Sequence, residues 1–320
     1  MNPKQLKRLF PALALPMILS SGVLKADVPN VVADIAPVHS LVSMVMKGVG
    51  EPKLLIPQNA SPHHYAMRPS EAKALQEANL VVYLGHDMSP WLEPLFETVA
   101  ASADPLDLSE VDGVLQLSYR EGPVFGEKEG HDDHDDHEGR DDHAHHDHDG
   151  NDPHMWLDPA NALVWLDAIA SELGHIDPEN AARYRANAKT AKEEISHETH
   201  HIEDHLKSVQ GKGFLVFHDA YQYFENRFGI FATGSISLGD ASKPSPKRLQ
   251  QLKHHFEEEG IHCVLSEPQY SSKLINSVFG GFKPHIGVVD PIGVDLELGS
   301  GLYLELLENI AVGIAQCVNH

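Results

Sequence analysis

Short apolar runs alternate with helical patterns along the first half of the chain. The runs are rich in Val, Ile and Leu, which is typical of strands buried in a sheet, and they cover residues 31–35, 53–56 and 80–85. The segments that follow them predict helices over residues 37–47, 69–78 and 91–103. Strands that alternate with helices favour a parallel sheet with crossover helices.

The second half of the chain repeats this alternation. Strands are predicted over residues 214–217, 262–266 and 287–289, and helices over residues 221–228, 247–259, 274–279 and 303–318. Between the halves, residues 178–206 are polar, with many alanines and charges at helical spacing, and predict one long helix.

This pattern predicts an α/β fold of two lobes, each with a mainly parallel sheet flanked by helices. The expected N-terminal lobe spans residues 27–177 and the C-terminal lobe residues 210–320, joined by one long linker helix over residues 178–209. Two lobes on one linker leave a cleft between them, and interdomain clefts are favoured ligand sites.

The first 26 residues have the pattern of a cleavable secretory signal. Lys4, Lys7 and Arg8 form a basic start, an apolar stretch broken by prolines follows, and Ala26 offers a small residue for cleavage. An uncleaved anchor is the alternative, although the stretch is short for a membrane span. No cysteine lies near the cleavage point, so a lipid anchor is not expected.

Composition and charge narrow the possible partners. The 320 residues include 47 Asp and Glu against 24 Lys and Arg, for a formal net charge of −23, together with 23 histidines. Such a negative charge repels nucleic acids and anionic membranes. Imidazole is a common ligand of borderline metals, so an acidic, histidine-rich chain indicates a cation as the partner.

One tract, within a predicted disordered loop over residues 121–150, concentrates these residue types. It has almost no apolar side chain with which to form a core. A flexible tract of imidazoles and carboxylates suits transient divalent binding, with a plain solvated spacer as the alternative. The candidate auxiliary ligands are His131, His134, His137, His143, His145, His146 and His148.

Four further candidate ligands lie at loop positions. His218 and Asp290 come at the ends of predicted strands, His63 lies in the loop after another, and His154 follows the acidic tract. In open α/β folds, ligand groups collect beyond the carboxyl ends of the strands. Three imidazoles and one carboxylate would complete a tetrahedral Zn²⁺ shell, whereas Mn²⁺ prefers more oxygen ligands.

A second histidine pattern lies within the long polar helix. His197-Glu198-Thr199-His200-His201 fits the H-E-x-x-H motif of zinc proteases. The surrounding helix is polar on nearly every face and the extended metzincin pattern is absent, so a protease is disfavoured. His197, His201 and His205 remain candidates for a weak accessory site, against the plain alternative of a solvated face.

The chain has two cysteines, Cys263 and Cys317. In an exported chain this number favours one disulfide, and two unpaired buried thiols are the alternative. Metal ligation by them is less expected, because the chain has no paired C-x-x-C spacing.

Five blocks of sequence, four of which contain a candidate ligand, resemble the metal-binding periplasmic proteins of ABC importers, specifically the zinc-capturing ZnuA type. The matching blocks begin at His63, His154, Phe217, Ser266 and Asp290; they read His-His-Tyr-Ala-Met-Arg-Pro-Ser, His-Met-Trp-Leu-Asp-Pro, Phe-His-Asp-Ala-Tyr-Gln-Tyr-Phe, Ser-Glu-Pro-Gln-Tyr and Asp-Pro-Ile-Gly. They occur in order over nearly the whole chain after residue 26.

The resemblance implies a soluble, monomeric periplasmic protein, not an enzyme, that captures zinc and delivers it to the membrane permease of an ABC transporter. It implies His63, His154 and His218 as ligands, with Asp290 as the fourth, and a disulfide between Cys263 and Cys317. Related manganese binders carry Glu at the place of His218, so this residue favours zinc over manganese or another divalent metal.

The chain departs from the family pattern at one place. Some members carry Glu just before the first ligand histidine, where this chain has Pro62, so Asp290 or a water must complete the shell. His64 adjoins His63, and we expect His63 to bind. The remaining alternatives are a secreted zinc hydrolase and a metal buffer whose main site is the histidine-rich tract.

Overall fold

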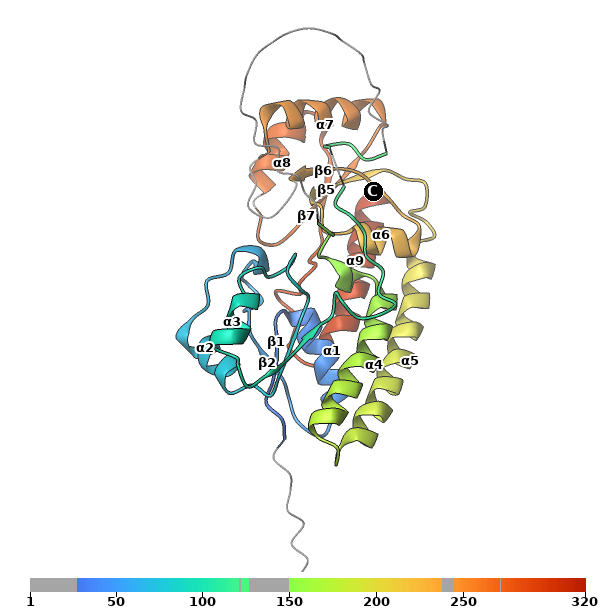
Figure 1. Cartoon of the computed structure of the whole chain (residues 1–320). Coiled ribbons are helices and arrows are strands. Elements are labelled where there is room, and N and C mark those ends of the chain that lie inside the picture. The colour runs from blue at the N-terminus through green and yellow to red at the C-terminus, as the bar shows by residue number, and fades with distance from the viewer. Residues whose placement is uncertain (1–27, 121, 127–149, 238–243, 271) are drawn as a thin grey trace, which may run out of the picture.

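The computed structural model describes residues 28–120, 122–126, 150–237, 244–270 and 272–320 (Figure 1). The expected signal segment, residues 1–26, and the tract that holds His131 to His148 lie outside these residues. Among the described residues, no helix is both long and apolar enough to cross a membrane.

The N-terminal lobe contains a parallel sheet of four strands in the order β2-β1-β3-β4. These are β1 (Val31–Ala33), β2 (Lys53–Leu54), β3 (Leu80–Tyr83) and β4 (Asp104–Asp107). Its helices are α1 (Ala36–Met46), α2 (Pro69–Gln76), α3 (Glu93–Thr98) and α4 (Pro159–Ile176). The central strands β1 and β3 are buried throughout, because helices or neighbouring strands cover them on all sides.

The C-terminal lobe contains a second parallel sheet, in the order β6-β5-β7-β8. Its strands are β5 (Phe214–His218), β6 (Ala232–Ser237), β7 (Cys263–Ser266) and β8 (His285–Val288). Its helices are α6 (Gln222–Phe228), α7 (Pro246–Glu258), α8 (Ser272–Phe279) and α9 (Leu302–Val318). Short 3-10 turns complete the fold at η1 (Pro62–His64), η2 (Met155–Leu157) and η3 (Gly280–Phe282). The two parallel sheets with flanking helices confirm the expected α/β class.

One long helix, α5 (Ala181–Leu206), runs from the N-terminal lobe to the C-terminal lobe, within the expected linker range of residues 178–209. It contacts α1 and α4 at one end and α6 and α9 towards the other. Although the helix is polar overall, it has one buried apolar stripe. The stripe consists of Tyr184, Ala188, Ala191, Ile195, Ile202 and Leu206.

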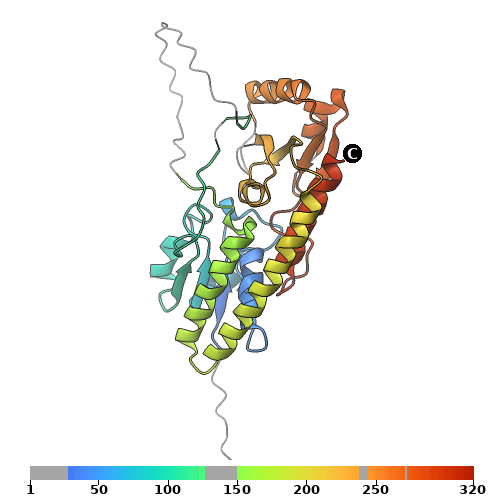
Figure 2. The same cartoon turned by 90° about the vertical axis from the view of Figure 1, so that its right-hand side faces the viewer.

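Helix α9 also extends beyond its own lobe. It packs against β7 and β8 of the C-terminal sheet and against α1 and α5 below it, and Figure 2 shows α5 and α9 side by side. As a result, buried side chains of both lobes belong to one continuous core. A disulfide between Cys263 of β7 and Cys317 of α9 fixes this helix to the sheet and confirms the expected pairing.

Three elements were not expected from the sequence: β4, β6 and α4. Strand β4 reads Asp-Pro-Leu-Asp and, within the part of the chain that the structure describes, pairs only with β3; proline is tolerated at such a sheet edge. Strand β6, Ala-Thr-Gly-Ser-Ile-Ser, is also an edge strand, and Ile236 is its only large apolar residue. Helix α4 is capped by Asp158, whose carboxylate accepts the N–H of Ala160, and Pro159 occupies its first helical position.

The chain crosses between the lobes before residue 127. We expected residues 122–126 to belong to a disordered loop of the N-terminal lobe. Instead Pro123 accepts a hydrogen bond from the N–H of Ser235 at 3.1 Å, and the N–H of Phe125 donates to Thr233 at 2.9 Å. This segment therefore pairs antiparallel with the free edge of β6, and the chain is back in the N-terminal lobe at Asn151, which bridges to Ser118.

Candidate metal centre

His63 lies on the 3-10 turn η1, in the loop that follows β2. The indole N–H of Trp91 donates to the carbonyl of Pro62 at 3.2 Å, which fixes the backbone directly before the histidine. The side chain of His63 is partly buried. The structure does not describe the side chain of His64, so the preference for His63 over its neighbour stays a prediction.

His154 directly precedes η2 and is almost fully buried. Its Nδ1 lies 2.7 Å from Oδ1 of Asp152, and its backbone N–H donates to the same oxygen at 3.0 Å. When the Asp152 carboxyl is ionised it only accepts, so Nδ1 then carries the proton and Nε2 is the nitrogen that could bind a metal ion. The hydroxyl of Tyr223, from α6 of the other lobe, donates to the carbonyl of Asp152 at 2.9 Å and holds this turn in place.

Burial raises the pKa of the Asp152 carboxyl to about 7, while the N–H of His154 and the positive charge of Arg120 act against this rise. A positive charge at the site therefore favours the ionised carboxylate, and with it the proton on Nδ1 of His154.

His218 ends β5, and its side chain is buried. Its Nδ1 lies 3.3 Å from Oε1 of Glu267, a buried carboxylate directly after β7. The register pairs Val216 with Leu265, so two residues further on His218 stands opposite Glu267. Glu267 is not among the residues predicted from the sequence, although it follows a buried strand just as His218 ends one.

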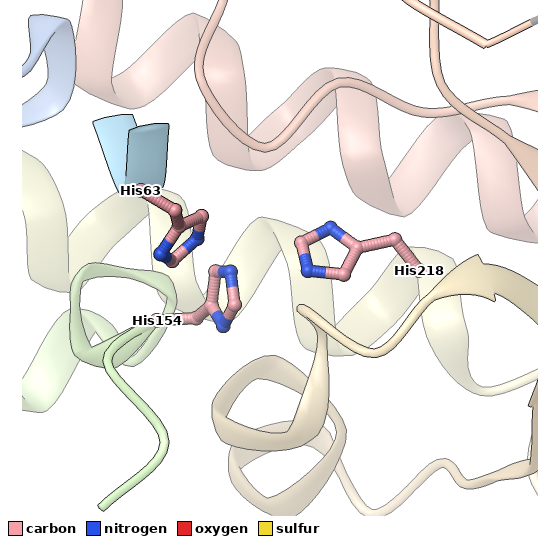
Figure 3. Close-up of side chains that lie close together, drawn as sticks. All are labelled: His63, His154 and His218. Atoms are coloured by element: carbon pink, nitrogen blue, oxygen red, sulfur yellow. The ribbon is translucent and has the colours of Figure 1, made fainter. Parts of the chain in front are cut away.

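The three imidazoles face one another (Figure 3), and their ligand atoms all lie within 4.8 Å of each other. The ring centroids are 4.9 Å apart for His154 and His218, 5.6 Å for His63 and His154, and 6.3 Å for His63 and His218. A tetrahedral zinc with Zn–N bonds of about 2.0–2.1 Å would hold each pair of centroids at about 5.2 Å. His154 and His218 thus have a centroid spacing close to that of a shared ion, and His63 would have to move inward by up to about 1 Å to join the same shell.

The three rings line a pocket between the lobes. Its other walls include Ser61 and Trp156 from the N-terminal side and Glu267, Tyr270 and Ile292 from the C-terminal side. The indole N–H of Trp156 donates to the carbonyl of Pro291 at 2.7 Å and so joins the two sides beneath the histidines. This position agrees with the expected interlobe cleft.

Asp290, the expected fourth ligand, is not part of this group of side chains. Its carboxylate accepts the backbone N–H groups of Ile292, Gly293 and Val294, at 3.0, 2.9 and 2.5 Å. The carboxylate therefore closes the turn after β8 in this structure, and its role as a ligand stays a prediction.

The other expected histidine pattern lies on the exposed side of α5. His197 and His201 are exposed, with ring centroids 4.7 Å apart. In the described parts of the chain, the only group of three or more histidine, cysteine or acidic residues with converging ligand atoms is His63, His154 and His218. The H-E-x-x-H segment therefore has no third protein ligand among the described residues.

Two α/β lobes around an interlobe pocket with three convergent imidazoles define a metal-binding protein of the two-lobed solute-binding class. The chain belongs to the ZnuA family, described as zinc-uptake complex component A, periplasmic, whose model matches residues 31–317. This family consists of solute-binding proteins of transporters and not of enzymes, which confirms the prediction from the sequence.

Curated relatives match over nearly their whole length. A protein of Brucella suis biovar 1, named high-affinity zinc uptake system protein ZnuA, is 39% identical over 99% of each chain. Relatives with the same name from Paracoccus denitrificans and Haemophilus influenzae are 39% and 31% identical, over 96% and 98% of this chain and 98% and 99% of theirs.

Solved structures share the fold. A crystal structure of ZnuA superposes with a TM-score of 0.73 at 23% identity, over 91% of this chain and 99% of that chain. The laminin-binding protein Lmb of Streptococcus agalactiae gives 0.71 at 22% identity with the same coverage. A manganese-bound periplasmic metal-binding protein of Candidatus Liberibacter asiaticus gives 0.72 at 18%, again over 91% and 99%. The fold alone therefore does not select the metal.

Proposed function

We propose that this protein captures Zn²⁺ in the periplasm and delivers it to the membrane permease of an ABC transporter. The observation that carries the proposal is the convergence of His63, His154 and His218 from both lobes into one pocket. The name shared by the relatives, high-affinity zinc uptake system protein, supports the same cargo.

The ligand chemistry favours zinc over manganese. Three neutral imidazoles suit a borderline cation, whereas Mn²⁺ prefers carboxylate and water oxygens. The two buried carboxylates next to the rings, Asp152 and Glu267, lie against Nδ1 atoms. Such partners orient imidazole ligands and increase their basicity, while the Nε2 atoms bind the ion. Asp290 or a water would complete the shell.

The position of the pocket suggests how the ion is retained and released. His218 comes from the C-terminal lobe and the other two histidines from the N-terminal lobe, so the shell is complete only while the lobes hold their spacing. The wider spacing of His63 makes it the ligand that closes last. We expect the permease to trigger release by displacing this ligand or one lobe, and the candidate ligands of the tract to add weak extra stoichiometry.

The decisive experiment measures zinc affinity by chelator competition in the mature protein and in His63→Ala, His154→Ala and His218→Ala. Each variant should lose at least about 100-fold in affinity, since a protein ligand contributes more than the 10–100-fold typical of an outer partner. His175→Ala, an exposed histidine on α4, is the matched control and should bind like wild type. Near-wild-type zinc affinity in all three variants would show that these histidines do not form the zinc site.

Two further measurements separate the finer parts of the proposal. Excess Mn²⁺ should leave bound Zn²⁺ in place in the same competition assay, and equal displacement would support the manganese alternative. Delivery is tested with vesicles that contain the cognate permease: ⁶⁵Zn uptake should require this protein and should fall with His218→Ala.

A further inference from the structure

We propose that the exposed face of α5 holds a second, weaker site for a borderline divalent cation, with His197 and His201 as its two protein ligands. The residues are one helical turn apart, both side chains are exposed, and their ring centroids lie 4.7 Å apart at an interplanar angle of 39°. This pair is separate from the interlobe pocket, which no residue of α5 lines.

The spacing of the rings fits a shared ion. With metal–nitrogen bonds of about 2.0–2.1 Å, two imidazoles on one ion have centroids about 4.5 Å apart at a right angle and about 5.2 Å apart at the tetrahedral angle. The observed 4.7 Å lies between these values. Binding thus requires only small side-chain rotations and no change in the backbone.

The helix holds the two histidines in this relation before an ion arrives. Ile195 and Ile202 on the opposite side of α5 are fully buried in the core that joins the lobes. The hydroxyl of Thr199 donates to the carbonyl of Ile195 at 2.8 Å, and the segment stays regular through Leu206. The backbone cost of bringing two ligands together is therefore already met by the fold.

The surroundings of the pair favour a cation. Glu194 and Glu203 are exposed on the same length of helix, and so is Glu193, which lies 3.9 Å from Lys189. The lysines nearby are already paired with carboxylates: Lys192 lies 2.6 Å from Asp167, and Lys207 contacts Asp204. The local field thus attracts a divalent ion and has little positive charge to oppose it.

The chemistry predicts a weak and rapidly exchanging site. Two imidazoles leave the remaining positions of the ion to water, whereas the interlobe pocket supplies three buried or partly buried imidazoles. Affinity should follow the usual order of divalent metals, with Cu²⁺ tightest, Ni²⁺ and Zn²⁺ weaker, and Mn²⁺ weakest. Without a third protein ligand, the segment resembles a zinc protease only in sequence.

The test uses the full mature protein loaded with one equivalent of Zn²⁺ and Ni²⁺ as the probe. Histidines are modified with diethyl pyrocarbonate at a series of Ni²⁺ concentrations, and peptide mass spectrometry reads His197 and His201 separately from the histidine-rich tract. Both residues should become protected together. In His197→Ala the protection of His201, and in His201→Ala that of His197, should require at least about tenfold more Ni²⁺, because one ligand of the chelate is gone.

His200→Ala is the matched control. The Nδ1 atom of His200 lies 2.6 Å from the carbonyl of Ser196, on the same exposed turn as the pair. Its replacement removes an imidazole from this turn and should leave the protection of His197 and His201 unchanged. Alanine favours helix, so none of these variants threatens the fold. Absent protection, protection of one partner that survives loss of the other, or equal loss in His200→Ala would each overturn the proposal.

Discussion

The Nδ1 atom of His154 lies 2.7 Å from Oδ1 of Asp152, and both side chains are almost fully buried. This contact fixes which nitrogen of the imidazole faces the interlobe pocket. It also places a carboxylate behind a candidate ligand, where its negative charge increases the basicity of the ring.

Replacement of this carboxylate should weaken zinc binding without removing a ligand. Asp152→Asn keeps an oxygen that accepts from Nδ1 but loses the charge, so we expect zinc affinity to fall by roughly 10–100-fold in chelator competition. Asp87→Asn is the matched control, since Asp87 accepts the N–H of Asn151 in the same segment but lies outside the histidine pocket. Equal affinities of the two variants would show that the charge of Asp152 has no effect.

Glu267 and Asp290 should have different effects on zinc binding. Glu267 lies against His218, so Glu267→Gln should lower zinc affinity by roughly tenfold or more. Asp290 accepts three backbone N–H groups, so Asp290→Asn should lower the thermal unfolding midpoint and cost less affinity than His63→Ala. A loss as large as that of His63→Ala would instead place Asp290 in the ligand shell, as the sequence predicted.

An ion pair across the lobes should contribute strongly to stability. Arg120 precedes residues 122–126, the segment that pairs with β6. Its guanidinium contacts Asp219 and lies 2.7 Å from Glu225 of α6. Both carboxylates are buried, so Arg120→Met leaves them without their cation and should lower the free energy of unfolding by about 3–5 kcal/mol in denaturant titrations.

An exposed ion pair provides the comparison for Arg120. Lys192 and Asp167 lie 2.6 Å apart at the surface, with 33% and 64% of their side chains exposed. Because water screens such a pair, Lys192→Met should cost no more than about 1 kcal/mol. If Arg120→Met cost as little, the interlobe contact would not hold the two lobes together.

His39 should make stability depend on pH. Burial lowers the pKa of this imidazole, and Glu51 nearby acts in the opposite direction. The folded state thus favours the neutral ring, so its contribution to stability is complete above the ordinary pKa of about 6.5 and is lost as the pH falls towards the lowered value.

The test compares unfolding free energies at about pH 7.5 and about pH 5.5. Wild type should lose more stability on acidification than His39→Gln, whose amide can still donate to the carbonyl of Pro52, now 3.1 Å from Nε2. His175→Gln, at an exposed position, should keep the wild-type pH dependence. If the His39→Gln profile parallels wild type, His39 does not control this dependence.

The alternation of apolar strands and helices was enough to predict the α/β class, because strand and helix periodicities are local. The same reasoning found His218, since β5 is a run of large apolar residues that ends on it. It missed β4 and β6, because these edge strands owe their conformation to pairing with a neighbour rather than to their own residues. Helix α4 was missed although Asp158 and Pro159 mark its start.

The sequence by itself thus determined the class of fold, the histidines that face the pocket and the type of metal that imidazoles prefer. Only the tertiary structure decided which carboxylates lie behind them. Asp152 is two residues from its histidine and could be expected from a local turn, but Glu267 meets His218 only because of the register between β5 and β7. The pairing of residues 122–126 with β6 was also decided by tertiary structure. The edge of a sheet has unpaired N–H and C=O groups, which form hydrogen bonds with the backbone that the fold places beside them.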